Sequence, residues 1–359
     1  MHSPFHTLTV DGRRLQGPAL LEWAAELEAA HRGPWARAVR AALDELCGGD
    51  GSMALRTSGT TGPPKAMRFP ARDLWASARL TARAFGLQQG DRALHGLPCD
   101  FVAGRMMLVR GFVIGLDLHF IDPAGGVLNN LRTDARFRFA AMVPNQLHRA
   151  LQDDRARLER QFDTVLLGGG PVSGALEEDL RVLGVRVVQG YGSTETLTHV
   201  ALRDVNGPGR TTHYTAIGEV TFSCDERDRL VVHTPHLTTP HHVTNDLVEL
   251  LDDRRFRWLG RADNVILTGG RKVHPEELER RTAGLLPFAH YFIGVPDDRL
   301  GQAVMLVVES ARTVEEVKAE VDRCLAGALA PHERPRRITV HRAFARTGTG
   351  KVQRTGQEG

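Results

Sequence analysis

"FRFAAMVPNQLHRALQDDRARLERQFDTVLLGGGPVSGALEEDLRVLGVRVVQGYG", residues 137–192, determines the predicted fold class. Three apolar runs, at 137–144, 162–170 and 185–192, have the length of buried strands, and two predicted helical segments, 145–152 and 173–184, separate them. Ser173 is a plausible N-cap of the second helical segment. Because alternating strands and helices are typical of a parallel sheet with crossover helices, we predict an α/β fold.

The pattern of the remaining chain predicts two domains. Two helical segments, 18–30 and 34–46, each begin near a proline. The pattern changes after about residue 261, where short helices and strands are expected over 274–286, 290–296, 303–310, 313–329 and 336–344. We therefore expect a large N-terminal domain with crossover-connected sheets over 1–261, and a small mobile α+β domain over 262–359.

Composition and charge exclude several classes of function. The 359 residues are 42% hydrophobic and 25% charged, as in ordinary globular proteins. The net charge of +3 is small and no basic arm is present, so nucleic acid is not an expected partner. No apolar run approaches the ~18 residues of a membrane span, and the first residues lack the apolar core of a signal peptide. These features predict a cytoplasmic protein without a membrane span.

Cysteine and histidine give no sign of a metal site. The four cysteines lie far apart, without a CxxC pair, and are expected to be reduced thiols. His233, His236, His241 and His242 cluster in "VVHTPHLTTPHH". Their spacing matches no familiar metal motif, so we expect solvated loop histidines.

A stretch rich in glycine and threonine, "SGTTGPP" at 58–64, offers phosphate-binding chemistry. Its two glycines let backbone N–H groups converge on one anion, and the hydroxyls and the lysine that follows add donors and charge. The stretch is not a Walker loop, because prolines stand where that pattern needs lysine and serine or threonine. The alternative is a hydrophilic turn. The residues concerned are Ser58, Gly59, Thr60, Thr61, Gly62 and Lys65.

With Thr57 included, "TSGTTGPPK" resembles the phosphate-binding signature of the adenylate-forming enzymes, a family that includes acyl-CoA synthetases, aryl-CoA ligases and adenylation domains. Five further segments resemble motifs of that family, in the family's order. They are "GGGP" at 168–171, "GYGSTET" at 190–196, "TNDLVEL" at 244–250, "LGRADNVILTGGRKVHPEELE" at 259–279 and "RTGTGKVQR" at 346–354. Six ordered motifs are a far more specific signal than any single glycine loop.

The resemblance implies an enzyme that joins a small carboxylic acid to CoA. In such enzymes the carboxylate first attacks the α-phosphorus of ATP, and a thiol then displaces AMP; Mg²⁺ is the expected cofactor. The residues that the resemblance assigns to ATP or AMP are Thr57, Ser58, Gly59, Thr60, Thr61, Gly62, Lys65, Gly168, Gly169, Gly170, Gly190, Tyr191, Gly192, Asp246 and Arg261.

The resemblance also implies individual roles. Lys351 and Thr194 are expected to be catalytic through contacts with the α-phosphate. Glu195 is expected to be both catalytic and a ligand of Mg²⁺, since hard cations take oxygen ligands. Tyr191 would stack on adenine, while Asp246 and Arg261 would bind the ribose. The corresponding structural alternatives are a core tyrosine, ion pairs and solvated loop side chains.

The hinge motif implies a rotation of the small domain between the two half-reactions. Asp263 is the expected hinge residue. Gly269 and Gly270 are expected to line the passage for the pantetheine arm of CoA, because residues without side chains suit a narrow tunnel.

Two segments narrow the resemblance further. Only about 56 residues precede Thr57, so the large domain is expected to be truncated at its N-terminus relative to most of the family. In this compact chain, "HGLPCDFVAGRMMLVRGF" at 95–112 and "YGSTETLTHVALRDVNGP" at 191–208 resemble the o-succinylbenzoate–CoA ligases of menaquinone biosynthesis. Arg105 is then a candidate to pair with a substrate carboxylate, with a structural arginine as the alternative. Thr198 and His199 are candidates for the wall of the acyl pocket.

Other functions remain open from the sequence. Another aryl- or acyl-CoA ligase would share every nucleotide motif. A stand-alone adenylation enzyme would load a carrier protein in place of CoA. A non-catalytic nucleotide-binding module is a further alternative, although binding alone requires neither Lys351 nor Glu195.

Overall fold

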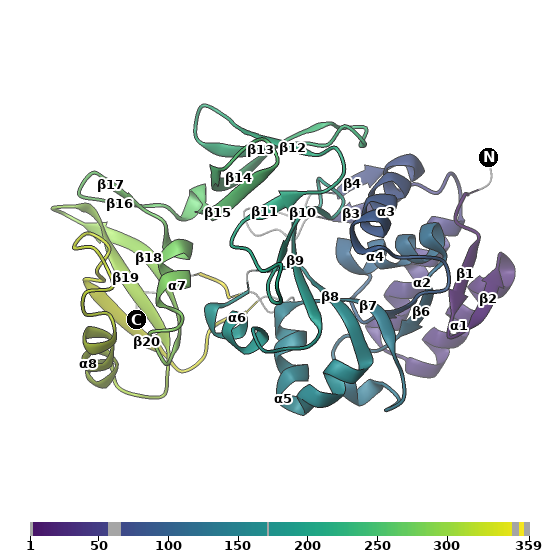
Figure 1. Ribbon diagram of the computed structural model, residues 1–359, viewed down its shortest axis with the longest axis horizontal. Coiled ribbons are helices and arrows are strands. Elements are labelled where there is room, and N and C mark those ends of the chain that lie inside the picture. Colours follow the sequence, from purple (N-terminus) through teal and green to yellow (C-terminus); the bar gives the residue numbers. More distant parts are fainter. Residues whose placement is uncertain (1–2, 57–65, 171, 347–351, 355–359) are drawn as a thin grey trace. The chain divides into compact units, whose positions relative to one another are not determined.

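The computed structural model describes residues 3–56, 66–170, 172–346 and 352–354 (Figure 1). The chain forms two compact units. The first comprises Met1–Pro171, Leu180–Thr221 and Val232–His242, and the second comprises Val172–Asp179, Phe222–Val231 and Val243–Gly359. The predicted domain boundary between residues 261 and 262 separates parts that are expected to move relative to each other, and it stays a prediction.

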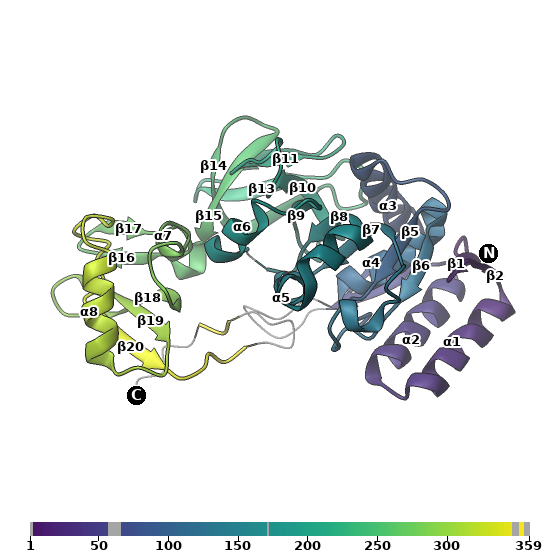
Figure 2. The same ribbon diagram turned by 60° about the horizontal axis from the view of Figure 1, so that its bottom comes forward.

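The first unit begins with a strand hairpin and two helices. Strands β1 (Thr7–Val10) and β2 (Arg13–Gln16) pair antiparallel. Helices α1 (Pro18–His31) and α2 (Pro34–Cys47) begin at the two prolines, as predicted, and pack side by side (Figure 2). A proline is favourable in the first helical turn because its missing N–H would have no partner there.

A parallel sheet forms the centre of this unit, which confirms the predicted α/β class. Neighbouring parallel strands are β1, β6 (Asp117–Phe120), β5 (Arg92–His95), β7 (Phe137–Met142), β8 (Phe162–Leu167) and β9 (Arg186–Gly192). Helix α5 (Pro144–Gln161) connects β7 to β8 and is longer than the predicted segment. Helix α6 (Gly174–Leu180) follows β8 in the chain, but its residues up to Asp179 belong to the second unit. Ser173 Oγ accepts the N–H of Leu176 at 3.2 Å, as expected of an N-cap.

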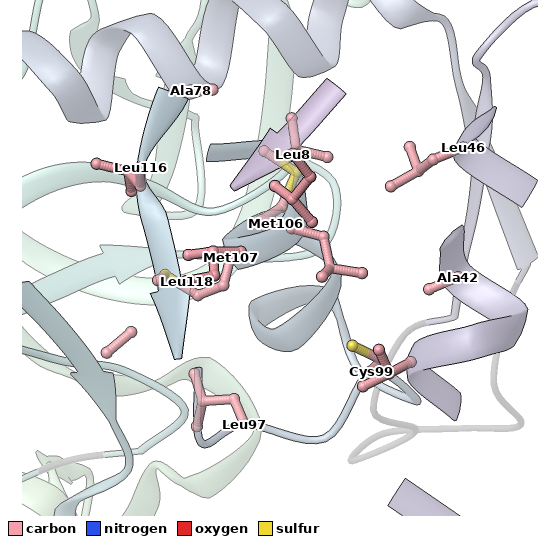
Figure 3. Close-up of a cluster of buried hydrophobic side chains, with 14 of the residues drawn as sticks. Leu8, Ala42, Leu46, Ala78, Leu97, Cys99, Met106, Met107, Leu116 and Leu118 are labelled. Carbon is pink, nitrogen blue, oxygen red and sulfur yellow. The ribbon is translucent and has the colours of Figure 1, made fainter. Parts of the chain in front are cut away.

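The remaining elements of the first unit surround this sheet. They are β3 (Met53–Arg56), β4 (Ala66–Phe69), α3 (Ala71–Phe85), α4 (Val102–Arg110), the single π-helical turn η1 (Gly111–Gly115), the 3-10 turn η2 (Leu128–Asn130), β10 (His199–Asp204) and β11 (Tyr214–Ala216). Apolar side chains from α2, α3, α4 and the sheet form one core, in which Leu8, Met106 and Leu118 lie close together (Figure 3). Strands β9 and β10 pair antiparallel beside the parallel strands.

From residue 275 onward, the second unit follows the helices and strands predicted for the end of the chain, whereas its earlier strands were not predicted from the pattern of the sequence. Strands β12 (Thr221–Cys224), β13 (Arg229–His233), β14 (His241–Leu250) and β15 (Arg255–Arg261) lie in that order. A 3-10 turn, η3 (Ala262–Asn264), leads to β16 (Ile266–Thr268), β17 (Arg271–Val273), α7 (Pro275–Thr282), β18 (Ala289–Asp297), β19 (Gly301–Glu309), α8 (Val314–Cys324) and β20 (Arg337–His341). The second sheet runs β17-β16-β19-β18, with β20 beside β19. Across the described ranges, every helix is too short or too polar to span a bilayer.

Candidate active site

The structure describes part of the predicted nucleotide site. Thr57, Ser58, Gly59, Thr60, Thr61, Gly62, Lys65 and the predicted catalytic residue Lys351 lie outside the described residues. The strands that flank the first group, β3 and β4, form an antiparallel pair in which Arg56 faces Ala66. The roles of these residues stay predictions.

The three glycines after β8 form a turn at the carboxyl end of the parallel sheet. The Gly168 N–H donates to the Met142 carbonyl at 3.1 Å, which ties the turn to the neighbouring strand. Gly169 has a φ of 79°, a conformation that glycine adopts without strain. The Gly170 carbonyl accepts a hydrogen bond from Gln189 Nε2 at 3.3 Å. Ligands of open α/β sheets bind beyond the carboxyl ends of the strands, where this turn lies.

Close approach of β10 explains the glycines on either side of Tyr191. A Cβ at Gly192 would overlap the Thr198 carbonyl oxygen, and a Cβ at Gly190 would lie 2.9 Å from the His199 Cβ. The register between β9 and β10 shifts between His199 and Ala201, which brings the two backbones together at this point. Both glycines therefore have a packing role, whatever ligand they contact.

Tyr191 belongs to a supported aromatic pair. Its ring centroid lies 5.6 Å from that of Tyr214, with the planes inclined by 57°. The guanidinium of Arg203 lies over the Tyr214 ring at 5.7 Å, and Arg203 Nε donates to Gln189 Oε1 at 2.7 Å. Gln189 therefore connects the turn at Gly170 to Arg203, which packs on the Tyr214 ring. Sequence reasoning missed it, although a glutamine inside the apolar run "VRVVQGYG" is an unusual choice for a buried strand.

A tight turn presents Thr194 and Glu195 after β9. Thr196, which is only 2% exposed, accepts the Ser193 N–H at 2.9 Å and donates to the Thr198 carbonyl at 2.9 Å. The Leu197 N–H donates to the Thr194 carbonyl at 3.0 Å. These bonds fix the turn without using the Thr194 or Glu195 side chains, which leaves both for a ligand.

The Glu195 side chain fits the predicted role as a magnesium ligand. It is half-buried, and within the described ranges its carboxylate accepts no hydrogen bond and forms no ion pair. Burial lowers the pKa of His242, while the nearby Glu195 opposes that change. No group of three metal-binding side chains lies together among the described residues. A Mg²⁺ ion that keeps several waters and takes oxygens from a bound phosphate needs only one or two carboxylates.

A buried cation lies beside the predicted acyl-pocket residues. Arg110, at the end of α4, is 2% exposed, and it donates to Thr81 Oγ1 at 3.3 Å and to Thr198 Oγ1 at 3.2 Å. Within the described ranges, no carboxylate lies within ion-pair distance of it. Burial lowers the pKa of Arg110 to about 10, yet the group stays charged at neutral pH. A buried charge without a counter-ion is costly and points to an anionic ligand.

His199 lies in the same buried group. Its Nε2 is 3.3 Å from Thr81 Oγ1. Burial, and secondarily the charge of Arg110, hold the pKa of His199 well below its ordinary value. The imidazole is therefore neutral, and Arg110 is the cation of this group.

Arg105 has structural partners. Its guanidinium forms an ion pair with Glu45 and donates to the Ala54 carbonyl at 3.0 Å, while its Nε donates to the Cys99 carbonyl at 2.8 Å. These contacts favour the structural alternative for Arg105. Arg110, which sequence reasoning missed, is the better placed candidate for a substrate carboxylate.

In the second unit, Asp246 and Arg261 lie together. They are cross-strand partners on β14 and β15, and their side chains are 3.6 Å apart. Arg261 also contacts Asp263 Oδ2 at 3.2 Å, in the 3-10 turn where the hinge is predicted. Gly269 and Gly270 have φ values of 55° and 77° in the turn between β16 and β17. Turn geometry thus accounts for these two glycines, and their role toward CoA stays a prediction.

The expectation of solvated loop histidines is partly wrong. His233 and His241 lie on strands β13 and β14, with their Nδ1 atoms 2.8 Å apart. His236 and His242 are half-buried, and burial lowers the pKa of each. Pairing of the two strands brings residues that are distant along the loop into one group.

Comparison with known proteins supports the predicted family. The family described as "AMP-binding enzyme" matches residues 13–227. A protein of Mycobacterium tuberculosis described as a probable 2-succinylbenzoate–CoA ligase is 33% identical over 332 residues, which cover 85% of this chain and 83% of the relative.

Solved structures agree on the fold. An acyl-CoA synthetase (AMP-forming)/AMP-acid ligase II-like protein from Dyadobacter fermentans matches with a TM-score of 0.60 and 35% identity, covering 90% of this chain and 93% of the other. The o-succinylbenzoate coenzyme A synthetase MenE from Bacillus subtilis, in complex with ATP and magnesium ion, matches with a TM-score of 0.69. Its identity is 21%, and the match covers 84% of this chain and 68% of that one.

Proposed function

The chain belongs to the AMP-binding enzyme family, and we propose that it is an ATP-dependent acid–CoA ligase that converts o-succinylbenzoate to o-succinylbenzoyl-CoA in menaquinone biosynthesis. The substrate carboxylate attacks the α-phosphorus of ATP and pyrophosphate leaves. The thiol of CoA then attacks the acyl carbon of the adenylate and AMP leaves. The name of the Mycobacterium tuberculosis relative supports the choice of acid.

The roles toward the nucleotide follow the predicted motifs. Tyr191 offers an aromatic face to the adenine, beside the turn at Gly168–Gly170. Asp246 accepts from the ribose hydroxyls, and Arg261 holds the aspartate in place. The segment 57–65 is proposed to bind the phosphates through backbone N–H groups, hydroxyls and Lys65.

The charge that develops on the phosphate needs cations. Thr194 donates its hydroxyl to the α-phosphate, and Lys351 stabilises the oxygens at the reacting phosphorus. Glu195 would hold Mg²⁺, which when bound neutralises charge on the phosphate oxygens. The small domain, residues 262–359, is proposed to rotate about Asp263 after adenylation, so that CoA enters past Gly269 and Gly270.

Arg110 is the observation that carries the choice of acid. o-Succinylbenzoate has two carboxylates, of which one is activated and the other stays ionised. A buried guanidinium beside Thr198 and a neutral His199 suits the second carboxylate. A monocarboxylic acid would leave this cation buried without a counter-ion.

Pyrophosphate exchange into ATP tests the proposal. The exchange is measured with o-succinylbenzoate and with a panel of aryl and short-chain monocarboxylic acids, with and without CoA. We expect exchange with o-succinylbenzoate, a thioester product when CoA is present, and loss of exchange of at least about a hundredfold in Lys351→Ala.

Each rival predicts a different result. Exchange with another acid only would identify a different acid–CoA ligase. Adenylate that persists in the presence of CoA would favour a carrier-loading enzyme. Nucleotide binding without exchange for any acid would refute the ligase and favour a binding module.

A further inference from the structure

A buried cluster of charges in the second unit connects the predicted hinge to the segment that carries Lys351. Glu276, in the first turn of α7, is 8% exposed, and its Oε1 accepts a hydrogen bond from Asn264. Its Oε2 has no hydrogen-bond partner in the described part of the chain. A Cβ at Gly260 would overlap this oxygen, so the backbone before the hinge packs directly on the carboxylate. Glu276 therefore contacts residues on both sides of Asp263.

Arg354 joins this carboxylate to a second one. Its guanidinium lies 3.7 Å from Glu276 Oε1 and donates to Glu279 Oε2 at 2.6 Å. Glu279 Oε1 in turn accepts the Phe292 N–H at 2.9 Å. The arginine also lies 5.9 Å over the ring of Tyr291. The Arg354 guanidinium thus forms ion pairs with two largely buried carboxylates, and no other cation in the described ranges lies within ion-pair distance of either.

Both flanks of the segment 347–351 are fixed to the second sheet. Arg346 forms a bridge with Val352, and the Gln353 N–H donates to the Ala345 carbonyl at 2.8 Å. Arg346 also forms an ion pair with Glu309 at 3.0 Å. Val352 packs near Tyr291 on one face of the sheet. Arg354 is the next polar anchor along the chain, three residues after Lys351.

The electrostatics make Arg354 hard to replace. Burial raises the pKa of Glu279 to about 7, Glu276 adds to that rise, and Arg354 opposes it. Without the guanidinium, two like-charged groups would be left together in a dry environment. Removing one partner of a buried pair leaves an uncompensated charge, which the structure relieves by separating the groups or by taking up a proton.

We propose that Arg354 is a positioning residue for adenylation: it anchors the described residues 352–354, which directly follow Lys351 in the sequence, and through Glu276 it links them to the hinge at 260–264. This inference rests on the proposed function, which gives Lys351 and Asp263 their roles. A rotation about Asp263 moves Gly260 relative to Glu276. The contacts of the Glu276 carboxylate, which Arg354 also binds, therefore change when the hinge rotates. The cluster acts on the step that needs Lys351.

The two half-reactions provide the activity test. In Arg354→Gln we expect kcat for pyrophosphate exchange to fall by at least about tenfold. Thioester formation from synthetic o-succinylbenzoyl-adenylate and CoA should change by less than about twofold, because it does not use Lys351. The matched control is Arg281→Gln. Arg281 lies on α7, as Glu276 and Glu279 do, and its guanidinium forms a bidentate ion pair with Glu333 that the substitution removes. It should leave both half-reactions within about twofold.

A purely structural role predicts a different pattern. Both half-reactions would then fall together, in proportion to the loss of folded protein, and that result would overturn the proposal. If Arg354→Gln does not fold, Arg354→Lys replaces it. Lysine keeps the charge but lacks the planar fork that bridges two carboxylates, so it should show the same split between the half-reactions.

Hydrogen exchange tests the link independently of activity. Asn264→Ala should speed exchange of amides at 344–346 and 352–354 by about fivefold, and Arg354→Gln should do the same at 260–266, since coupling between two sites is reciprocal. Arg281→Gln should change neither region. Unchanged exchange at the distant region in both variants would refute the link. If the link is found but the wild-type protein exchanges pyrophosphate with no acid, the proposed function fails and the link stands.

Discussion

Replacing Arg110 by methionine should raise the stability of the ligand-free protein and lower kcat/KM for o-succinylbenzoate. The two effects have one cause, because a guanidinium buried without a carboxylate is costly until an anionic ligand arrives. Methionine has a similar length and no charge. Residues that bind ligands are often retained although they lower stability, and here both the loss of stability and the gain in catalysis can be measured.

The structure gives the size of the stability effect. Burial lowers the pKa of Arg110 from its ordinary value to about 10, so the charged form is disfavoured in the folded protein. At about 1.36 kcal/mol per pKa unit, this difference amounts to about 3 kcal/mol at neutral pH. The hydrogen bonds to Thr81 and Thr198 oppose it and are lost in Arg110→Met. We expect a net gain of about 1–3 kcal/mol in the free energy of unfolding of the ligand-free protein.

The effect on catalysis should depend on the acid. Loss of a desolvated charge pair costs about 2–5 kcal/mol, so kcat/KM for o-succinylbenzoate should fall by about a hundredfold to a thousandfold. Any aryl monocarboxylic acid that the enzyme accepts should lose less than about threefold. Urea denaturation gives the stability, and pyrophosphate exchange gives kcat/KM for each acid.

Arg105→Met is the matched control on the same helix. Arg105 already pairs with Glu45, so its removal should destabilise the free protein by about 2–4 kcal/mol without discriminating between acids. The reasoning is refuted if Arg110→Met destabilises the free protein as Arg105→Met does, or if it lowers kcat/KM equally for mono- and dicarboxylic acids.

Three further predictions test other parts of the candidate site and the core. Gly192→Ala should lower the free energy of unfolding by more than about 3 kcal/mol, whereas Gly168→Ala, where a Cβ meets nothing within 4 Å, should cost less than about 1 kcal/mol; chemical denaturation compares them. Gln189→Leu leaves the Gly170 carbonyl without its donor and should raise KM for ATP by about tenfold in pyrophosphate exchange. Burial lowers the pKa of His95 to about 4, so as the pH falls below 6.5 the histidine is protonated in the unfolded chain before it is protonated in the folded protein. Acid titration should therefore show a loss of up to about 3 kcal/mol in the free energy of unfolding by pH 4. His95→Gln should lack this loss.

Local patterns predicted the elements well because their causes are local. The prolines at 18 and 34 mark the starts of α1 and α2, and strands β7, β8 and β9 follow their apolar runs. Helix ends were predicted less well: α6 ends at Leu180, before the predicted segment does. Ends depend on tertiary contacts that propensity does not contain.

The motifs predicted a candidate site, and the structure gives packing reasons for some of its residues. Gly190 and Gly192 were predicted from a resemblance to bind a nucleotide. The structure shows that a side chain at Gly192 would overlap the Thr198 carbonyl and one at Gly190 would crowd His199, next to a register shift between His199 and Ala201. A bulge between two strands is not visible in either strand alone, so no reading of "GYGSTET" could have supplied this cause.

The choice between Arg105 and Arg110 shows what sequence leaves open even within one helix. The two residues are five positions apart on α4, which places them about 140° apart around an α-helix of about 3.6 residues per turn. One faces Glu45 of α2, and the other faces Thr81 of α3 and Thr198. Both arginines satisfy the chemistry of a carboxylate site, and only the side of the helix decides which of them has a free charge. That side is set by packing against α2 and α3, so a contact between helices, not a motif, determines which arginine lacks a carboxylate partner in the described part of the chain.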